Sequence, residues 1–496
     1  MASAQQTGLW ERVDARRGRR EFVEVDAPAA RSRRFRWVVD AMLPIALLVV
    51  AGVAVMLPAT LPGEARVALF GFALATILWS TTKLNAAYVA LGAVMLTILA
   101  GGSPQEQLYE ALASDVIWLM IGAFVLGGAM RVTGLAGRLT GLVVNRARSV
   151  RGVFWLMTFV LIPLSFVIPS TSGRAAVMMP VFKGVSETVG DGKVSRALAL
   201  LIPTIILVST ITTLIGAGSH LIANDLLAQI SGERISFAQW ALWGVPFGLA
   251  ASAASCWVIL RMFLDKDRRG INLDMGGGEE RRPFSGAERG TLLVLLAMVS
   301  LWMTEGVHGF EIATVTMIGA LALTLPGVGV MKWKDGLKSV SWNLIIFVGA
   351  ALALGKALID SGAAEWIIQN LFRASGIRET ESVFLVLLII AFVSLTSHVY
   401  MTSHAARAVA LVPPVLYLAN SLNLDPMAVL FISTAGMDYC QTFPVSSKAL
   451  LMFQEGAGET FEPADLLRLS AVLLPVHVVL MVFFYYGYWQ WTGLAL

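Results

Sequence analysis

Charged residues are scarce in this chain. Only 14% of its 496 residues are Asp, Glu, Lys or Arg, whereas 57% are hydrophobic, and soluble domains carry about 25% charged residues. This scarcity excludes an ordinary soluble domain. Apolar runs of about twenty residues recur along the chain, and each is long enough to cross a hydrocarbon core of about 30 Å. The composition therefore predicts a helical membrane protein with many spans.

Cysteine and the common catalytic motifs are also missing or nearly so. The two cysteines, Cys256 and Cys440, lie in apolar segments far apart in the sequence, which excludes a disulfide framework and a cysteine-based metal site. No HExxH, GxSxG or aspartate-dyad pattern is present, so an enzyme embedded in the membrane is not expected. No cleavable signal is expected either, because the first apolar run, near Trp37, follows a long polar arm.

The apolar runs predict whole helices and interrupted ones. The whole helices are expected at 37–57, 65–80, 86–100, 115–130 (extending toward 144), 241–264, 291–303, 312–325, 342–359 and 470–489. The interrupted segments are 154–185, 197–228, 382–418 and 427–453, broken in turn by PSTSGR, TTLIGAGSH, TSHVYMTSHAAR and DYCQTFPVSSK. Small and polar residues in a span are typical of unwound backbone, which is tolerated only inside protein or beside water.

The two halves of the chain repeat the same order of elements. Each runs as whole helix, broken pair, broken helix, whole helix, and RAAVMMP at Arg174 matches RAVALVP at Arg407. Such a repeat is typical of secondary transporters. We expect a basic arm at 1–36, an N-terminal half at 37–264, a polar linker at 265–290 and a C-terminal half at 291–496.

The basic residues indicate the topology. The arm is rich in arginine, and the charges beside the spans agree with a cytoplasmic N-terminus if both broken pairs are re-entrant hairpins. Only Arg373 and Arg378 then lie on the outer side of the membrane. The predicted fold is an all-α polytopic membrane protein of about eleven crossings, an inverted repeat with two re-entrant hairpins and two broken helices. We expect it in a bacterial inner membrane, with no nucleic-acid partner.

Each half places an arginine where lipid would make a charge costly. Arg174 follows PSTSG and Arg407 follows TSHAA, and a charge inside a span must face protein or water. Helix N-termini at the two tips add amide donors that favour an anion. The sequence therefore predicts one anion site built from both halves. The alternative is that each arginine caps helix carbonyls or pairs with an acid.

Further polar residues cluster at the same four breaks. The candidate substrate-binding residues are Ser170, Thr171, Ser172, Arg174, Ser403, His404, Arg407, Ser446, Ser447 and Lys448. The candidate ion-coupling residues are Thr171, Gly216, Gly218, Ser219 and Asp438. For Asp438 the alternative is a local ion pair with Lys448. His398 and His477 are interpreted as structural, and His220 is a weaker cationic candidate.

These features resemble the divalent anion:sodium symporter family, which moves dicarboxylates, tricarboxylates or sulfate. The resemblance runs from about residue 40 to the end. That family has Ser-Asn-Thr at each hairpin tip, ten residues before a proline. Here Ser170-Thr171-Ser172 precedes Pro180 and Ser403-His404-Ala405 precedes Pro413 by that spacing. The family's Gly-Thr-Pro-Pro-Asn-like loops correspond to 216–220 and 444–448.

The resemblance implies an elevator-type carrier, a homodimer, whose tips and loops hold two sodium ions and the substrate carboxylates. Both tip asparagines are replaced here, by Thr171 and His404. We hypothesise that Arg174, Arg407, His404 and Lys448 supply the positive charge that sodium supplies in the family, since arginine suits carboxylate or sulfate oxygens. Coupling is then to Na⁺, to protons or to anion exchange, and no cofactor beyond Na⁺ is expected.

Three other membrane functions remain open at this point. An oxyanion or arsenite pump component and a cation/proton antiporter both use related inverted-repeat scaffolds. A channel is less favoured, because paired unwound helices are typical of an occluded site rather than a continuous pore. Saturable flux that trades one anion for another favours the carrier, whereas current without counterflow favours the channel.

Overall fold

A computed structural model describes residues 9–13, 20–24, 30–144, 146–273, 283–364, 366, 370, 382–401, 403–456 and 459–496. The chain divides into two units, Met1–Leu57 and Pro58–Leu496. Part of the expected linker and both outlying arginines, Arg373 and Arg378, lie outside the described residues.

The first unit holds a short β-hairpin and one long helix. Strands β1 (Leu9–Val13) and β2 (Arg20–Glu24) pair antiparallel, with Leu9 opposite Glu24. Helix α1 spans Ala30–Met56 and therefore begins before the expected start at Trp37. Its apolar part, Met42–Met56, coincides with the first predicted span.

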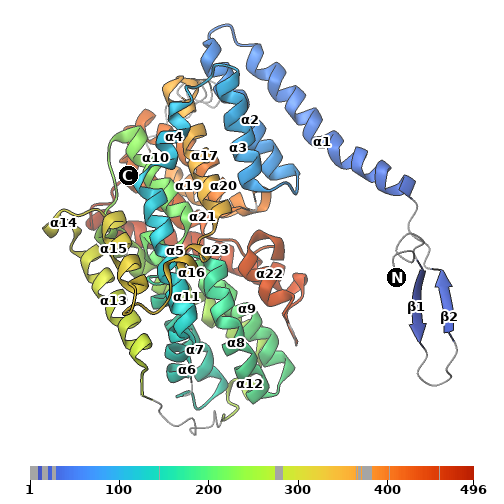
Figure 1. Cartoon of the computed structure of the whole chain (residues 1–496), viewed down its shortest axis with the longest axis vertical. Helices are drawn as coiled ribbons and strands as arrows, with labels where there is room; N and C mark the ends of the chain where they lie inside the picture. Colours follow the sequence, from blue (N-terminus) through green and yellow to red (C-terminus); the bar gives the residue numbers. More distant parts are fainter. Residues whose placement is uncertain are drawn as a thin grey trace. The chain divides into compact units, whose positions relative to one another are not determined.

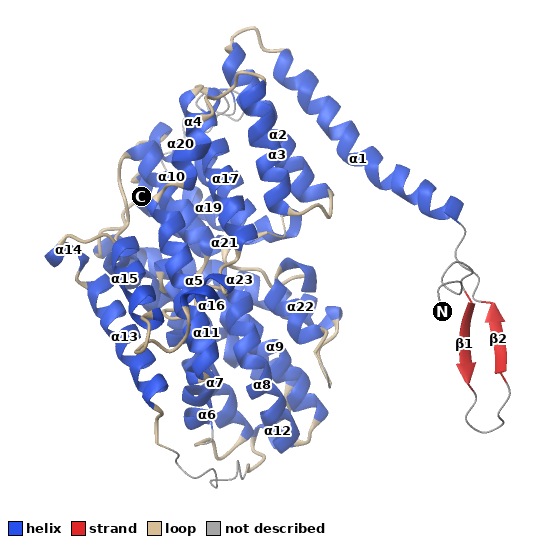
Figure 2. Ribbon diagram, viewed as in Figure 1, coloured by secondary structure: helices blue, strands red, loops and turns tan. Residues whose placement is uncertain are grey.

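The second unit is built from helices (Figure 2). Its first half contains α2 (Gly63–Thr81), α3 (Ala86–Leu99), α4 (Glu106–Leu112), α5 (Asp115–Thr133), α6 (Leu135–Val144), α7 (Val150–Leu164), α8 (Thr171–Val189), α9 (Gly192–Val208), η2 (Thr210–Thr212), η3 (Leu214–Gly216), α10 (Gly218–Ser231), α11 (Phe237–Phe263) and α12 (Lys266–Arg269).

The second half is also helical. It contains α13 (Gly286–Met303), α14 (Glu305–His308), α15 (Ile312–Thr324), α16 (Trp333–Lys338), α17 (Trp342–Asp360), α19 (Val383–Tyr400), α20 (His404–Ser421), α21 (Pro426–Met437), η5 (Pro444–Ser446), α22 (Lys448–Gln454), α23 (Pro463–Gly487) and η6 (Trp489–Trp491).

Many of these helices can cross a membrane. Among the described residues, eight are long and apolar enough, and shorter apolar helices account for further predicted spans. In the span Gly192–Thr212, which contains α9, 94% of the most apolar 18-residue stretch is buried inside the protein, whereas the value for Gly63–Thr81 is only 22%. Helix α9 therefore lies in the centre of the unit, and α2 presents most of its surface outward. The prediction of an all-α polytopic membrane protein is confirmed.

Serine caps set the two hairpin breaks. The Ser170 hydroxyl accepts a hydrogen bond from Gly173 N at 3.2 Å and starts α8, and the Ser403 hydroxyl accepts one from Ala406 N at 3.3 Å and starts α20. Such caps satisfy amides that the first helical turn leaves free. Helix α19 runs further than predicted, to Tyr400, and the Thr396 hydroxyl donates to Phe392 O within it.

Hydroxyl groups also unwind the first broken helix. The Thr210 hydroxyl donates to Ile206 O at 2.9 Å and to Leu207 O at 2.6 Å, so a side chain occupies the carbonyls that the next turn of α9 would use. The chain continues as two 3₁₀ turns and re-enters an α-helix at Gly218. The matching segment of the second half runs over 438–447.

The helix that follows each break packs against the other half of the chain. Helix α10, from the first half, packs against α20 and α21 of the second, and α22 packs against α8 and α9 of the first (Figure 1). Each unwound segment is thereby held next to the other half's hairpin. This interlocking brings both hairpin tips and both breaks into one region of the unit.

Gly216 allows the first unwound segment to fold back on itself. A Cβ built there would lie 2.2 Å from Thr210 O, closer than any real contact. We expect Gly216→Ala to destabilise the protein by about 1–3 kcal/mol through overpacking and to lower its melting temperature in detergent. Gly218→Ala is the matched control, since its Cβ would meet only side-chain methyl groups at 3.4 Å or more. Equal melting temperatures for the two variants would contradict this packing.

Candidate functional site

Arg174 projects from the first turn of α8 into the unwound segment of its own half. Its side chain is completely buried. The guanidinium group donates to Ser209 Oγ at 3.4 Å, to Thr210 Oγ1 at 3.3 Å and to Gly216 O at 3.1 Å. All of these partners are uncharged, so within the described residues hydrogen bonds hold the arginine without a carboxylate against it.

Arg407 occupies the matching place in the second half and is less well satisfied. It is also completely buried, and its Nη2 contacts the Cys440 thiol in the unwound segment of that half. Its Nε and Nη1 have no hydrogen-bond partner among the described residues. A buried cation with free N–H groups is costly. Arg407 is therefore the strongest indication of a missing anionic partner.

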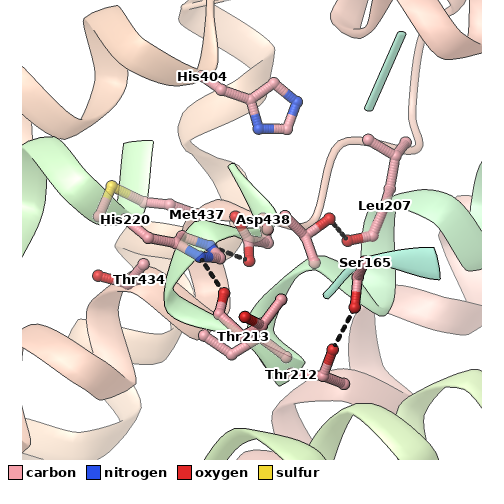
Figure 3. A network of polar contacts seen from close by, with 12 residues as sticks. Ser165, Leu207, Thr212, Thr213, His220, His404, Thr434, Met437 and Asp438 are labelled. Atoms are coloured by element: carbon pink, nitrogen blue, oxygen red, sulfur yellow. Dashed lines mark hydrogen bonds and ion pairs between the residues drawn. The ribbon is translucent and has the colours of Figure 1, made fainter. Parts of the chain in front are cut away.

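A histidine–aspartate pair joins the two unwound segments. His220 Nε2 lies 2.8 Å from Asp438 Oδ2, although the two residues are 218 positions apart. Figure 3 shows the His220 ring between Asp438 and the Thr213 carbonyl, which lies 3.0 Å from Nδ1. Trp240 packs against the imidazole with ring centroids 4.9 Å apart. The pair links α10, which follows the break in the first half, to the unwound segment of the second half.

Several polar atoms around this pair have no partner in the described structure. They are Thr213 Oγ1, Ser219 Oγ, Ser446 Oγ, Asp438 Oδ1 and both amide atoms of Gln441. All belong to the unwound segments or to the first turns that follow them. Because buried polar groups are normally hydrogen-bonded, this concentration indicates a place where a polar ligand binds.

His404 lies at the tip of the second hairpin, and Figure 3 shows it apart from the His220–Asp438 pair. Its Nε2 is 3.3 Å from the Cys440 thiol that Arg407 also contacts. His404 lies close enough to Arg407, His220 and Arg174 to interact with them electrostatically. Arg174 in turn interacts electrostatically with Asp438. The charged groups of both halves thus converge, and a single shared anion site stays a prediction.

The remaining predicted site residues surround this cluster or lie outside it. Ser170 and Ser172 share a hydrogen bond of 3.1 Å, and with Thr171 they are half-buried at the first tip. The Ser447 hydroxyl caps α22 by accepting from Ala449 N. Lys448 is exposed and does not enter the cluster. The expected alternative pairing of Asp438 with Lys448 is wrong, because Asp438 faces His220 from the other half.

Sequence reasoning missed several residues of the cluster. Ser209 and Thr210 were not singled out, although they precede the predicted break by only a few positions, and Cys440 was considered only to exclude a disulfide framework and a metal site. The hydroxyl-rich run from Ser209 to Thr213 was the available signal. Nothing in the sequence indicated that Trp240 stacks on His220.

A second hydrogen-bonded chain lies behind the second break. His398 Nε2 is 2.6 Å from Thr442 Oγ1, which is 2.7 Å from Ser470 Oγ, and Tyr439 OH completes the chain at 3.0 Å from Ser470. In the first half, Ser165 and Thr212 make the corresponding contact at 2.7 Å (Figure 3). The interpretation of His398 and His477 as structural stays a prediction.

Broken helices whose unwound segments enclose buried charge define a membrane transporter. A family model described as the sodium:sulfate symporter transmembrane region matches residues 38–495. The chain belongs to this family. It is an integral membrane protein and a secondary transporter of small anions, not an enzyme.

Individual relatives agree with this assignment. The sodium-dependent dicarboxylate transporter SdcS of Staphylococcus saprophyticus is 24% identical over 82% of this chain and 83% of its own. The citrate/succinate antiporter of Escherichia coli K12 is 21% identical over 75% and 77%. The crystal structure of the Alcanivorax borkumensis YdaH transporter, at 12% identity, matches with a TM-score of 0.59 over 86% of this chain and 99% of that one, which supports the fold.

Proposed function

We propose that this protein carries small dianions, of the di- or tricarboxylate or sulfate-like class, in a site between the two hairpin tips. The observation that carries the proposal is the pair of buried arginines, of which Arg407 retains free N–H groups. A carboxylate or sulfate oxygen is the natural acceptor for such groups. The named substrates of the two relatives, dicarboxylates and citrate or succinate, support this class.

The charges of the cluster support an anion without obligatory sodium. Arg174 and Arg407 contribute two positive charges and Asp438 contributes at most one negative charge, so the site carries a net positive charge. A dianion reduces the cost of burying both guanidinium groups. We infer that a proton on the His220–Asp438 pair, or exchange for a second anion, supplies the remaining balance.

Movement of the site is proposed to follow the elevator scheme. Helices α8, α10, α20 and α22 interlock across the halves, so the hairpins and broken helices are suited to move as one body. A homodimer whose remaining helices form the fixed part is included in the proposal. Its test is the mass of the protein in detergent, for which one chain per particle would speak against the dimer.

Sodium independence is the first expected result. In proteoliposomes, uptake of labelled succinate, citrate or sulfate should persist when Na⁺ is replaced by K⁺, because the arginines already provide fixed positive charge. An inward proton gradient or a trapped internal anion should accelerate it. Uptake that requires Na⁺ strictly, and still does so in Arg174→Gln, would overturn the proposed coupling.

A further inference from the structure

A basic and aromatic cavity lies at the ends of α7 and α11, away from the buried cluster. It has a volume of about 310 Å³ and is lined by the cations Arg151, Arg261, Lys266 and Arg269 and by the rings of Trp155 and Trp257. Among the described residues, the lining contains no Asp or Glu. A volume of this size is at the low end of small-molecule sites, enough for a headgroup but not for acyl chains.

The four cations are free to bind an anion. None forms an ion pair with a carboxylate in the described part of the chain, and Arg269 donates only to the backbone oxygen of Asp265 at 3.3 Å. The nearby carboxylates of Asp191 and Asp265 are already engaged by Arg268, at 3.0 and 2.8 Å. Their negative charge is therefore directed at a residue outside the cavity lining.

The cavity also continues onto an apolar surface. Trp257 is 54% exposed and lies under the Arg261 guanidinium at 5.4 Å. Leu242 and Leu249, further along the same helix, are exposed as well, so this side of α11 is suited to face lipid. Tryptophan at the end of a spanning helix is typical of the membrane interface. Positive charge that can bind a phosphate therefore lies next to an apolar surface that can bind acyl chains.

We propose that this cavity binds the phosphate headgroup of an anionic phospholipid, with the acyl chains along α11. Basic pockets between spanning helices are suited to such headgroups, and each Lys or Arg near an anionic membrane surface strengthens binding about fivefold. The site is independent of the transported anion. It joins α7, the first arm of the hairpin that carries Arg174, to α11.

Native mass spectrometry of the full-length protein tests the proposal. Short-chain phosphatidylglycerol should bind more tightly than phosphatidylcholine, and Arg261→Gln/Arg269→Gln should weaken phosphatidylglycerol binding about 25-fold, at fivefold per cation. The double variant Lys332→Gln/Lys334→Gln, which removes two exposed charges elsewhere, should bind as the wild type does.

Several outcomes would overturn the lipid site. Equal binding of both lipids, or unchanged affinity in Arg261→Gln/Arg269→Gln, would show that the cavity does not recognise the headgroup charge. Displacement of the lipid by millimolar inorganic phosphate would show that the cavity takes a free anion instead. An equal loss in the lysine control would show a general surface-charge effect.

Discussion

Arg407→Gln is expected to reduce anion uptake about 100-fold while leaving the protein folded. Arg407 is buried, and among the described residues two of its guanidinium nitrogens have no hydrogen-bond partner while the third bonds the Cys440 thiol. A charge-assisted hydrogen bond contributes about 1.5–3 kcal/mol, so losing two such bonds to the substrate removes at least two orders of magnitude in affinity. Glutamine keeps a polar side chain but neither the charge nor the bidentate geometry.

Initial uptake rates in proteoliposomes over a range of substrate concentrations measure this effect. Arg407→Lys should recover only part of the activity, because lysine restores the charge but not the planar, bidentate guanidinium group. Arg131→Gln, which removes an exposed arginine on α5, is the matched control and should transport normally. A folded Arg407→Gln protein with wild-type uptake would show that this arginine is structural.

Asp438→Asn is expected to abolish proton-driven accumulation while retaining anion exchange. The Asp438 carboxylate faces His220 at 2.8 Å through one oxygen, and its other oxygen has no partner in the described part of the chain. Arg174, Cys440 and His404 are the other titratable groups that act on this pair. Asparagine preserves the shape and an acceptor for His220 but cannot exchange a proton, so the coupling step is lost.

The measurement is steady-state accumulation under an inward gradient of one pH unit, which allows about tenfold accumulation for one proton per cycle, since one pH unit corresponds to 1.36 kcal/mol. The wild type should approach that ratio, and Asp438→Asn and His220→Gln should not exceed equilibration. Asp225→Asn is the control, because Asp225 lies on α10 but pairs with Arg234 and Gln229 instead. Full accumulation by Asp438→Asn would show that the coupling proton binds to a group other than Asp438.

The helical architecture follows from local sequence. Each apolar run became a helix, and each cluster of Gly, Ser, Thr and Pro became a break, because propensity and hydrogen bonding act over a few residues. The errors are at boundaries: α19 continues to Tyr400, and α1 starts at Ala30. Helix ends depend on local geometry that composition does not reveal.

The site was only partly predictable. The arginines were recognisable because a charge in an apolar run has few tolerable locations, and both are buried. Their partners depend on how the halves interlock. His220 meets Asp438 only because α10 packs against α21, a contact between residues 218 positions apart. Lys448 looked suitable by position, but it turns outward at the start of α22.

The two breaks provide their arginines with different hydrogen-bond partners. In the first half the arginine rests on Ser209, Thr210 and the Gly216 carbonyl. In the second, the hydrogen-bond partner of the arginine side chain within the described residues is Cys440. The better-satisfied Arg174 is therefore suited to a fixed, orienting role, and the less satisfied Arg407 to direct contact with the anion.

The position of a bound anion tests the central claim most directly. Crystals of the protein with bromosuccinate or selenate, measured at the bromine or selenium absorption edge, would locate the anion by anomalous scattering. We predict a single strong peak between the hairpin tips, within hydrogen-bonding reach of Arg407 and near Arg174 and His404. A peak elsewhere, with both guanidinium groups still enclosed by protein alone, would contradict the assignment of these arginines to the transported substrate.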